Sequence, residues 1–178
     1  VRCVSFLHHP YGSPTRGWLS DVENLTAEDA KGFYDRFYVP NNATLVLVGD
    51  FNSANALVSI KKYFGAFTRS ATPIPVIRAK EPEQRAERRV LMKYPGKTEL
   101  LQVSYHAPSI AEHDSAAMAV LEKLLNASIS GRLKTKLMEP KICAGANCQF
   151  ELKHDPGLIT FTATPASGQT LQKTLDAI

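Results

Sequence analysis

Histidine is the side chain in this sequence best suited to bind a metal or to transfer a proton near neutral pH. A helical zinc site needs two histidines four positions apart, as in H-x-x-E-H, so that both imidazoles share one face. No two of the histidines have this spacing; they are His8, His9, His106, His113 and His154. Ser109–His113 (SIAEH) is similar, but it has serine at the first ligand position and follows Pro108. We therefore predict no metal ligand and no catalytic residue in this chain.

Other catalytic motifs are also missing from the sequence. There is no G-x-S-x-G elbow, no phosphate-binding P-loop and no G-x-G-x-x-G. Gly49-Asp50 follows an apolar run, but one glycine cannot surround a phosphate, so we interpret this pair as a turn. We predict no cofactor-binding residue.

The three cysteines, Cys3, Cys143 and Cys148, do not form a usual metal pair, because the last two have the spacing C-x4-C. Cys148 alternates with apolar residues, which predicts a buried structural thiol. A Cys143–Cys148 disulfide remains an alternative.

Composition limits the class of protein. The chain has 178 residues, of which 44% are hydrophobic and 21% charged, so a packed core is expected. The net charge is only +4, and acids alternate with the basic residues between Arg85 and Lys97, so we predict no nucleic-acid partner. No apolar run approaches the roughly 20 residues of a membrane helix, so we predict no membrane partner.

Helical and strand periods divide the first third of the chain. Thr26 and Asp29 form a capping-box pattern that starts a helix, and Pro40 ends it. Ala43–Val48 is an apolar run of strand length. Ser53 is the expected N-cap of a second helix, which Gly65 ends. The expected apolar helix faces are Ala30, Phe33, Tyr34, Phe37 and Tyr38, then Ala56, Leu57, Ile60, Tyr63 and Phe64.

The remaining two thirds begin with a proline-rich linker over residues 68–87. Val90–Tyr94 and Leu101–Ala107 alternate like two strands of a half-buried sheet, joined by a turn at Pro95-Gly96. A helix then opens at Asp114 or Ser115, and a short one covers Gly131–Met138. The expected apolar face of the first of these helices is Ala117, Val120, Leu121, Leu124 and Leu125.

The C-terminal part reads as a β-hairpin followed by a helix. Ala146–Leu152 and Ile159–Ala163 alternate apolar and polar residues on either side of His154-Asp155-Pro156-Gly157, and Gly168 precedes the last helix. Adjacent strands with helices between them predict an α+β fold, an antiparallel or mixed sheet with helices packed on one face.

Two blocks of this sequence resemble the pitrilysin/insulinase family of zinc metallopeptidases. The more specific block contains H-P-Y-G, N-L-T-x-E-D, F-Y-x-x-Y-x-P-x-N, an apolar strand ending V-G-D, and Y-F-G; these are His9–Gly12, Asn24–Asp29, Phe33–Asn42, Leu45–Asp50 and Tyr63–Gly65. The looser block comprises Leu100–Ile110, Ser130–Glu139 and His154–Leu158. The resemblance covers nearly the whole chain.

The resemblance implies homologous α/β domains, with zinc on an H-x-x-E-H helix that lies upstream of the H-P-Y-G loop. Because the chain opens with Val1, without a leader, and ends in a helical pattern, we expect a segment of a longer protein. Residues 1–67 would be the tail of a zinc-type domain, residues 68–87 a linker, and residues 88–178 the head of the next, non-catalytic domain. Zinc is then expected in the full-length parent and not in this chain.

The family also carries an arginine and, seven residues later, a tyrosine, which hold substrate in the half opposite the zinc. The matching positions here are Met138 and Gly145, and neither side chain can donate a hydrogen bond to an oxyanion. The resemblance therefore points away from that substrate-clamping domain.

Three function hypotheses follow. The first is a non-catalytic chamber-wall portion of a zinc endopeptidase acting on peptides or unfolded chains, inactive alone, whose sheet edge supports an extended substrate. Its partners would be the remaining domains of its parent and peptide substrates. The second is a scaffold or assembly domain of a non-peptidase relative. The third, a basic binding module, rests on the small net charge alone.

Assembly and location are less constrained by the sequence. The two halves of the chain either complement each other or exchange between two copies as a domain-swapped homodimer. The family resemblance suggests the bacterial periplasm or secretion.

Overall fold

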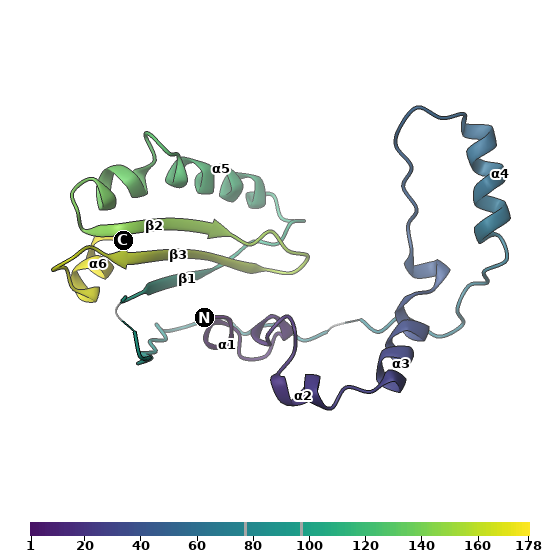
Figure 1. The fold of residues 1–178 in the computed structure, drawn as a ribbon, viewed down its shortest axis with the longest axis horizontal. Coiled ribbons are helices and arrows are strands. Elements are labelled where there is room, and N and C mark those ends of the chain that lie inside the picture. Colours follow the sequence, from purple (N-terminus) through teal and green to yellow (C-terminus); the bar gives the residue numbers. More distant parts are fainter. Residues whose placement is uncertain (77, 97) are drawn as a thin grey trace. The chain divides into compact units, whose positions relative to one another are not determined.

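A computed structural model describes residues 1–76, 78–96 and 98–178, and the chain divides into two compact units (Figure 1). The sheet unit comprises Val1–Thr15 and Lys80–Ile178. The helical unit comprises Arg16–Ala79. The sheet unit thus brings the N-terminal segment together with the C-terminal half of the chain.

The helical unit contains α2 (Leu19–Glu23), α3 (Ala27–Phe37), the short 3-10 helix η2 (Pro40–Asn42) and α4 (Ser53–Phe64). The predicted capping box is confirmed, since Asp29 N–H donates to Thr26 Oγ1 (3.2 Å) and Thr26 N–H donates to Asp29 Oδ2 (3.0 Å). The N-cap of α4 is Asn52 and not Ser53, because Asn52 Oδ1 accepts from Asn55 N–H (3.1 Å). Gly65 ends α4 as predicted.

The predicted strand Ala43–Val48 is wrong, because this segment has no strand structure in the described chain. Val46 is 73% exposed and Val48 is 92% exposed. An apolar run becomes a strand only when a neighbouring strand supplies hydrogen bonds, and the described part of the helical unit contains no strand. The apolar faces of α3 and α4 form but bury no residue.

The sheet unit is built on three antiparallel strands in the order β1-β3-β2, namely β1 (Leu101–Ala107), β2 (Cys143–Phe150) and β3 (Gly157–Pro165). The predicted hairpin of β2 and β3 is confirmed, with Cys148 opposite Phe161 and Phe150 opposite Ile159. The sheet also pairs Val103 with Phe161. The predicted α+β class with an antiparallel sheet is therefore correct.

The second predicted strand of the sheet, Val90–Tyr94, is not a strand. Its apolar residues Val90, Met92 and Tyr94 are 61%, 69% and 82% exposed. β3 takes the place beside β1 that this segment was expected to fill, so alternation alone predicted the wrong partner. The described residues Pro95-Gly96 form a bend, and the next residue, Lys97, lies outside the described chain.

Helices α5 (Asp114–Asn126) and η3 (Lys134–Met138, a short π-helix) cover one face of the sheet. Their residues join strand residues in one core cluster; its buried members are Ala107, Leu133, Leu137, Cys143, Cys148, Phe150, Ile159 and Ala163. The sheet unit also contains α1 (Arg2–Ser5), the 3-10 helix η1 (Pro10–Gly12) and α6 (Leu171–Ala177), which lies against β1 and β3.

The apolar face predicted for α5 is mostly wrong. Met118, Ala119 and Leu125 pack against the core cluster, whereas Val120 is 59% exposed and Leu124 is 62% exposed. This helix carries apolar side chains around most of its circumference, so the helical period fits two different faces. The sequence pattern could not decide which of the two contacts the sheet.

The cysteines are all free thiols, so the alternative disulfide between Cys143 and Cys148 is not formed. Cys148 is 2% exposed, which confirms the predicted buried thiol. Burial, together with the nearby Glu122 carboxylate, raises the pKa of Cys148 to about 11, so this thiol stays protonated at neutral pH.

Replacing Leu137, which is 2% exposed, with alanine tests the assigned core. We expect Leu137→Ala to lower the free energy of unfolding by about 2–5 kcal/mol, because it leaves a cavity under the sheet. The matched control Leu124→Ala should change it by no more than about 0.5 kcal/mol. Urea unfolding followed by circular dichroism measures both, and equal losses would show that α5 packs through the other face.

Candidate functional site

The H-P-Y-G segment forms a tight turn at the start of the sheet unit. His9 is only 8% exposed and caps η1, because its Nδ1 accepts from Tyr11 N–H (3.2 Å). Pro10 occupies the first helical position, where its lack of an N–H has no cost. A Cβ at Gly12 would lie 2.8 Å from the carbonyl oxygen of Phe6, so only glycine fits this close approach. The motif therefore describes the geometry of a turn.

Four aromatic rings pack around this turn. The ring of Phe6, which is 4% exposed, lies 5.9 Å from the Tyr11 ring and 5.2 Å from the His106 ring, both in edge-on geometry. The rings of His9 and Tyr11 are 4.3 Å apart. Because His106 belongs to β1, this aromatic cluster attaches the N-terminal segment to the sheet.

The same segment is held to the end of the β2–β3 hairpin by polar contacts. Lys153 Nζ lies 4.4 Å above the Tyr11 ring, and Asp155 N–H donates to the Tyr11 hydroxyl oxygen (3.3 Å). His9 Nε2 is 3.5 Å from Asp155 Oδ2. With Nδ1 accepting from the backbone, Nε2 carries the proton that points to this carboxylate.

Glu151 adds an ion-pair bridge between the N-terminal helix and the hairpin. Arg2 Nη2 lies 2.7 Å from its Oε1, and Lys153 Nζ lies 2.8 Å from its Oε2. Burial acts to raise the pKa of Glu151, but the hydrogen bonds and charges of Lys153 and Arg2 outweigh it and lower the pKa.

Glu81 fixes the backbone of the turn itself. Its carboxylate accepts from the N–H groups of Leu7 (2.8 Å), His8 (2.9 Å) and His9 (3.1 Å). Burial acts to raise the pKa of Glu81, but these backbone hydrogen bonds outweigh it and lower the pKa to about 2. Glu81 comes from the segment predicted as a linker, and its sequence context gives no sign of this contact.

This set of residues anchors one segment to another and does not form a reactive centre. Both ring nitrogens of His9 already face partners, and the carboxylates of Glu81 and Glu151 are engaged by hydrogen bonds or ion pairs. Within residues 1–76, 78–96 and 98–178, no three histidine, cysteine or acidic side chains converge on one point. The described residues do not fit a zinc centre.

The other positions considered for chemistry lie apart from one another. His8 is exposed while His9 is buried, as expected for neighbours in a loop. His113 and His154 are exposed. Glu112 of the SIAEH segment accepts from Ser109 N–H (2.8 Å), so its carboxylate closes a local turn. Met138 ends η3, and Gly145 lies in β2 beside a register shift.

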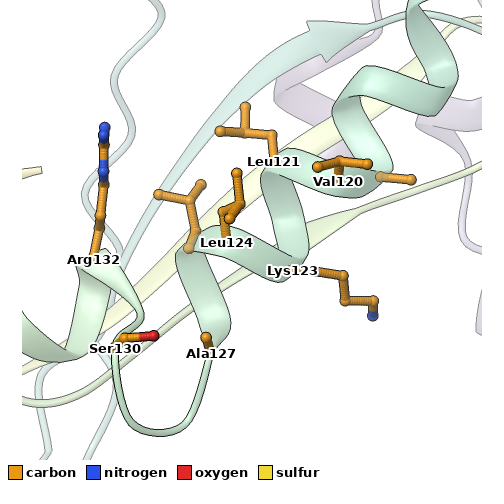
Figure 2. A pocket seen from close by; sticks show the side chains of 9 residues that line it. Val120, Leu121, Lys123, Leu124, Ala127, Ser130 and Arg132 are labelled. Atoms are coloured by element: carbon orange, nitrogen blue, oxygen red, sulfur yellow. The ribbon is translucent and has the colours of Figure 1, made fainter.

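An open groove of about 660 Å³ runs along the exposed side of α5. Figure 2 shows Val120, Leu121 and Leu124 along the helix, with Arg132 on the following helical segment, after the loop that carries Ser130. Val120 and Leu124 leave a contiguous apolar strip in solvent, since they are 59% and 62% exposed. Such a strip beside two cations, Lys123 and Arg132, is typical of an interface.

Comparison with known proteins identifies the family of this chain. Residues 24–178 match the family model described as the peptidase M16 inactive domain. The chain belongs to this family. The expected relation to pitrilysin-type zinc proteases is thereby confirmed, and this M16 inactive domain is the non-catalytic kind of domain found in such proteins.

A curated sequence and a solved structure from Helicobacter pylori resemble this chain over most of its length. The zinc protease PqqE of that organism is 28% identical over 183 residues, which is 98% of this chain and 41% of that protein. A protease crystal structure from the same organism has a TM-score of 0.89 and 26% identity, covering 98% of this chain and 43% of that one. The chain thus spans about two fifths of these relatives.

A third structure supports the fold alone. The crystal structure of a peptidase M16 inactive domain from Pseudomonas fluorescens is 16% identical with a TM-score of 0.75, over 99% of this chain and 47% of that one. The described part of this chain has no helix that is long and apolar enough to cross a membrane.

Acid titration should show the contribution of Glu81 to stability. Its pKa is about 2 in the folded chain and 4.5 ordinarily, so its stabilisation is complete above about pH 4.5 and is lost as pH falls toward 2. We expect Glu81→Gln to lower the free energy of unfolding by roughly 1–3 kcal/mol at neutral pH, with a smaller deficit in acid.

Urea unfolding of both chains at several pH values measures this difference, and Glu83→Gln, a neighbouring exposed carboxylate, is the control. A deficit that stays constant down to the acid limit would contradict the assigned hydrogen bonds.

Proposed function

We propose that this M16 inactive domain is a non-catalytic wall portion of a zinc-dependent endopeptidase, with the remaining domains of its parent chain as its partners. The observation that supports this proposal is the combination of family membership with large apolar surfaces that the chain leaves exposed. The proposed role is to pack against the zinc-bearing domain and to support peptide substrates, while the zinc and the hydrolysis belong to the parent.

The groove along α5 is the strongest of these surfaces. Its exposed Val120 and Leu124 face away from the core cluster, so covering them would remove apolar area from water without disturbing the sheet. The relatives are more than twice as long as this chain, because the chain spans 41% of PqqE. We infer that an apolar segment of the remaining parent chain occupies the groove, with polar or acidic groups beside Lys123 and Arg132.

The helical unit supports the same proposal. Phe33 and Tyr34 of α3 are each 58% exposed, and Tyr63 of α4 is 66% exposed. Ala43–Val48 lies beside them in sequence as an exposed apolar segment with strand composition. We propose that residues 1–67 belong to the tail of a zinc-type domain, that residues 68–87 are the linker, and that residues 88–178 begin the following domain.

A scaffold role in a non-peptidase relative is the second candidate. Met138 and Gly145, at the positions of the family's substrate-holding arginine and tyrosine, favour it. The parent sequence upstream of His9 separates the two candidates, because an intact H-x-x-E-H favours the peptidase. Placement of the parent in the bacterial periplasm or outside the cell is part of the proposal and rests on the family resemblance.

Zinc titration of the isolated chain tests whether zinc binding and hydrolysis belong to the parent and not to this chain. We expect calorimetry to show no tight one-to-one zinc site and no hydrolysis of an unfolded polypeptide when zinc is added, since the described residues offer no converging ligands. The parent protein, if it carries the zinc motif, is the positive control. A tight site or hydrolysis in the isolated chain would overturn the proposal.

A lysine in the α5 groove tests the packing role. In the isolated chain, Leu124→Lys should change the free energy of unfolding by less than about 0.5 kcal/mol, because the side chain is already exposed. In the parent protein it should cost at least about 2 kcal/mol, because the charge would be buried.

Thermal unfolding of both proteins measures the two effects. Ile129→Lys, at an 82% exposed position outside the groove, is the control. An equal, small effect of Leu124→Lys in both proteins would show that the groove remains open to solvent in the parent.

A further inference from the structure

The two edges of the sheet differ in how their backbone groups are satisfied. Just beyond β2, Glu151 N–H donates to the Leu158 carbonyl oxygen (2.9 Å), so the backbone of Glu151 faces β3. Facing residues of antiparallel strands alternate between bonding to the partner and pointing away from it. By this alternation the backbone groups of Cys148, and of Ala146, point to the outer edge of the sheet.

The outer edge of β2 is already occupied at Cys148. Asn126, the last residue of α5, accepts from Cys148 N–H through Oδ1 (2.8 Å) and donates to the Cys148 carbonyl oxygen through Nδ2 (2.6 Å). One acceptor and one donor offered to the same residue is what a residue of a neighbouring strand would supply. The carboxamide of Asn126 thus takes the place of a strand partner.

The outer edge of β1 is different. Phe161 of β3 lies opposite Cys148, whose backbone groups point away from β3, so the backbone groups of Phe161 face its other partner, Val103 of β1. By the same alternation, the backbone groups of the β1 residues Gln102, Ser104 and His106 point away from β3, to the outer edge. In the described part of the chain these backbone groups have no hydrogen-bond partner. β1 therefore presents an open edge, whereas the edge of β2 is occupied at Cys148.

We propose that Asn126 closes the β2 edge of the sheet against strand addition, so that an extended polypeptide can pair only with β1. Open edges attract further strands, and natural sheets block them with covering side chains or loops. For a peptide substrate, the closure means that an extended chain pairs with β1 and not with β2. This application to substrate rests on the proposed function. The closure itself is a property of this chain alone.

An ordinary stabilising role for Asn126 would not produce the same pattern. A residue that only completed the end of α5 would direct its amide to the last carbonyls of its own helix, which lack intrahelical partners. Both hydrogen bonds of Asn126 run instead to the strand. The experiments must therefore measure whether the β2 edge can pair with another strand, as well as the stability of the fold.

Amide hydrogen exchange of the unaltered 178-residue chain gives the first test. We expect the Cys148 amide to exchange at least about tenfold more slowly than the Ala146 amide, although both face the same edge, because within the described residues only the Cys148 N–H has a hydrogen-bond partner. Equal exchange of the two amides would overturn the proposal.

Self-association gives the second test, with a second copy of the chain as the probe. We expect Asn126→Ala to raise the association constant in sedimentation by about tenfold or more over Asn147→Ala, an exposed amide on the same strand. Adding Ala146→Pro should abolish this gain, because proline removes an N–H that faces the outer edge and would pair with an added strand. The pairing of β2 with β3 does not use this N–H. Adding Ser104→Pro, on the β1 edge, should leave it.

No gain in association for Asn126→Ala, or a gain removed by Ser104→Pro and not by Ala146→Pro, would overturn the proposal. If Asn126→Ala fails to fold, the exchange rates of the unaltered chain decide alone. These measurements do not depend on a peptidase parent, so failure of the proposed function would leave them unchanged.

Discussion

The fold of the sheet unit depends on supplying hydrogen-bond partners to backbone groups that regular structure leaves free. The clearest case is the Glu81 carboxylate, which accepts from three consecutive N–H groups, of Leu7, His8 and His9, more than 70 residues away in sequence. Hydrogen bonds from backbone N–H groups to an ionised carboxylate are stronger than those between neutral groups. One side chain thereby holds the turn in which Gly12 approaches Phe6 and His9 becomes buried.

This constraint gives the H-P-Y-G motif a structural meaning. A histidine, a tyrosine and neighbouring acids would suit a catalytic site by residue type alone. Here His9 uses one nitrogen to cap a helical turn and directs the other to Asp155, while Tyr11 lies beneath Lys153. Each group serves to attach the N-terminal segment to the hairpin, so the motif acts as a structural element of the described chain.

The sequence predicted those features that short-range physics determines. The capping box of Thr26 and Asp29 and the alternation of β2 and β3 need only a few neighbouring residues, and both are found. Ala43–Val48 and Val90–Tyr94 fail as strands because pairing depends on a partner that their own pattern does not specify. The contacts of Glu81 and Asn126 were also missed, since a single polar residue leaves no periodic signal.

The apolar face of α5 that stays exposed bears on the proposed role in packing against other domains. Met118 and Leu125 pack on the sheet while Leu124 stays in solvent, so this helix has one apolar side more than the described chain covers. A self-contained domain would gain nothing from a second apolar stripe and would risk aggregation. A domain that packs against further domains on that side would need it. The closed edge at β2 complements this arrangement, because it limits growth of the sheet to β1 while leaving the outer face of α5 available for packing.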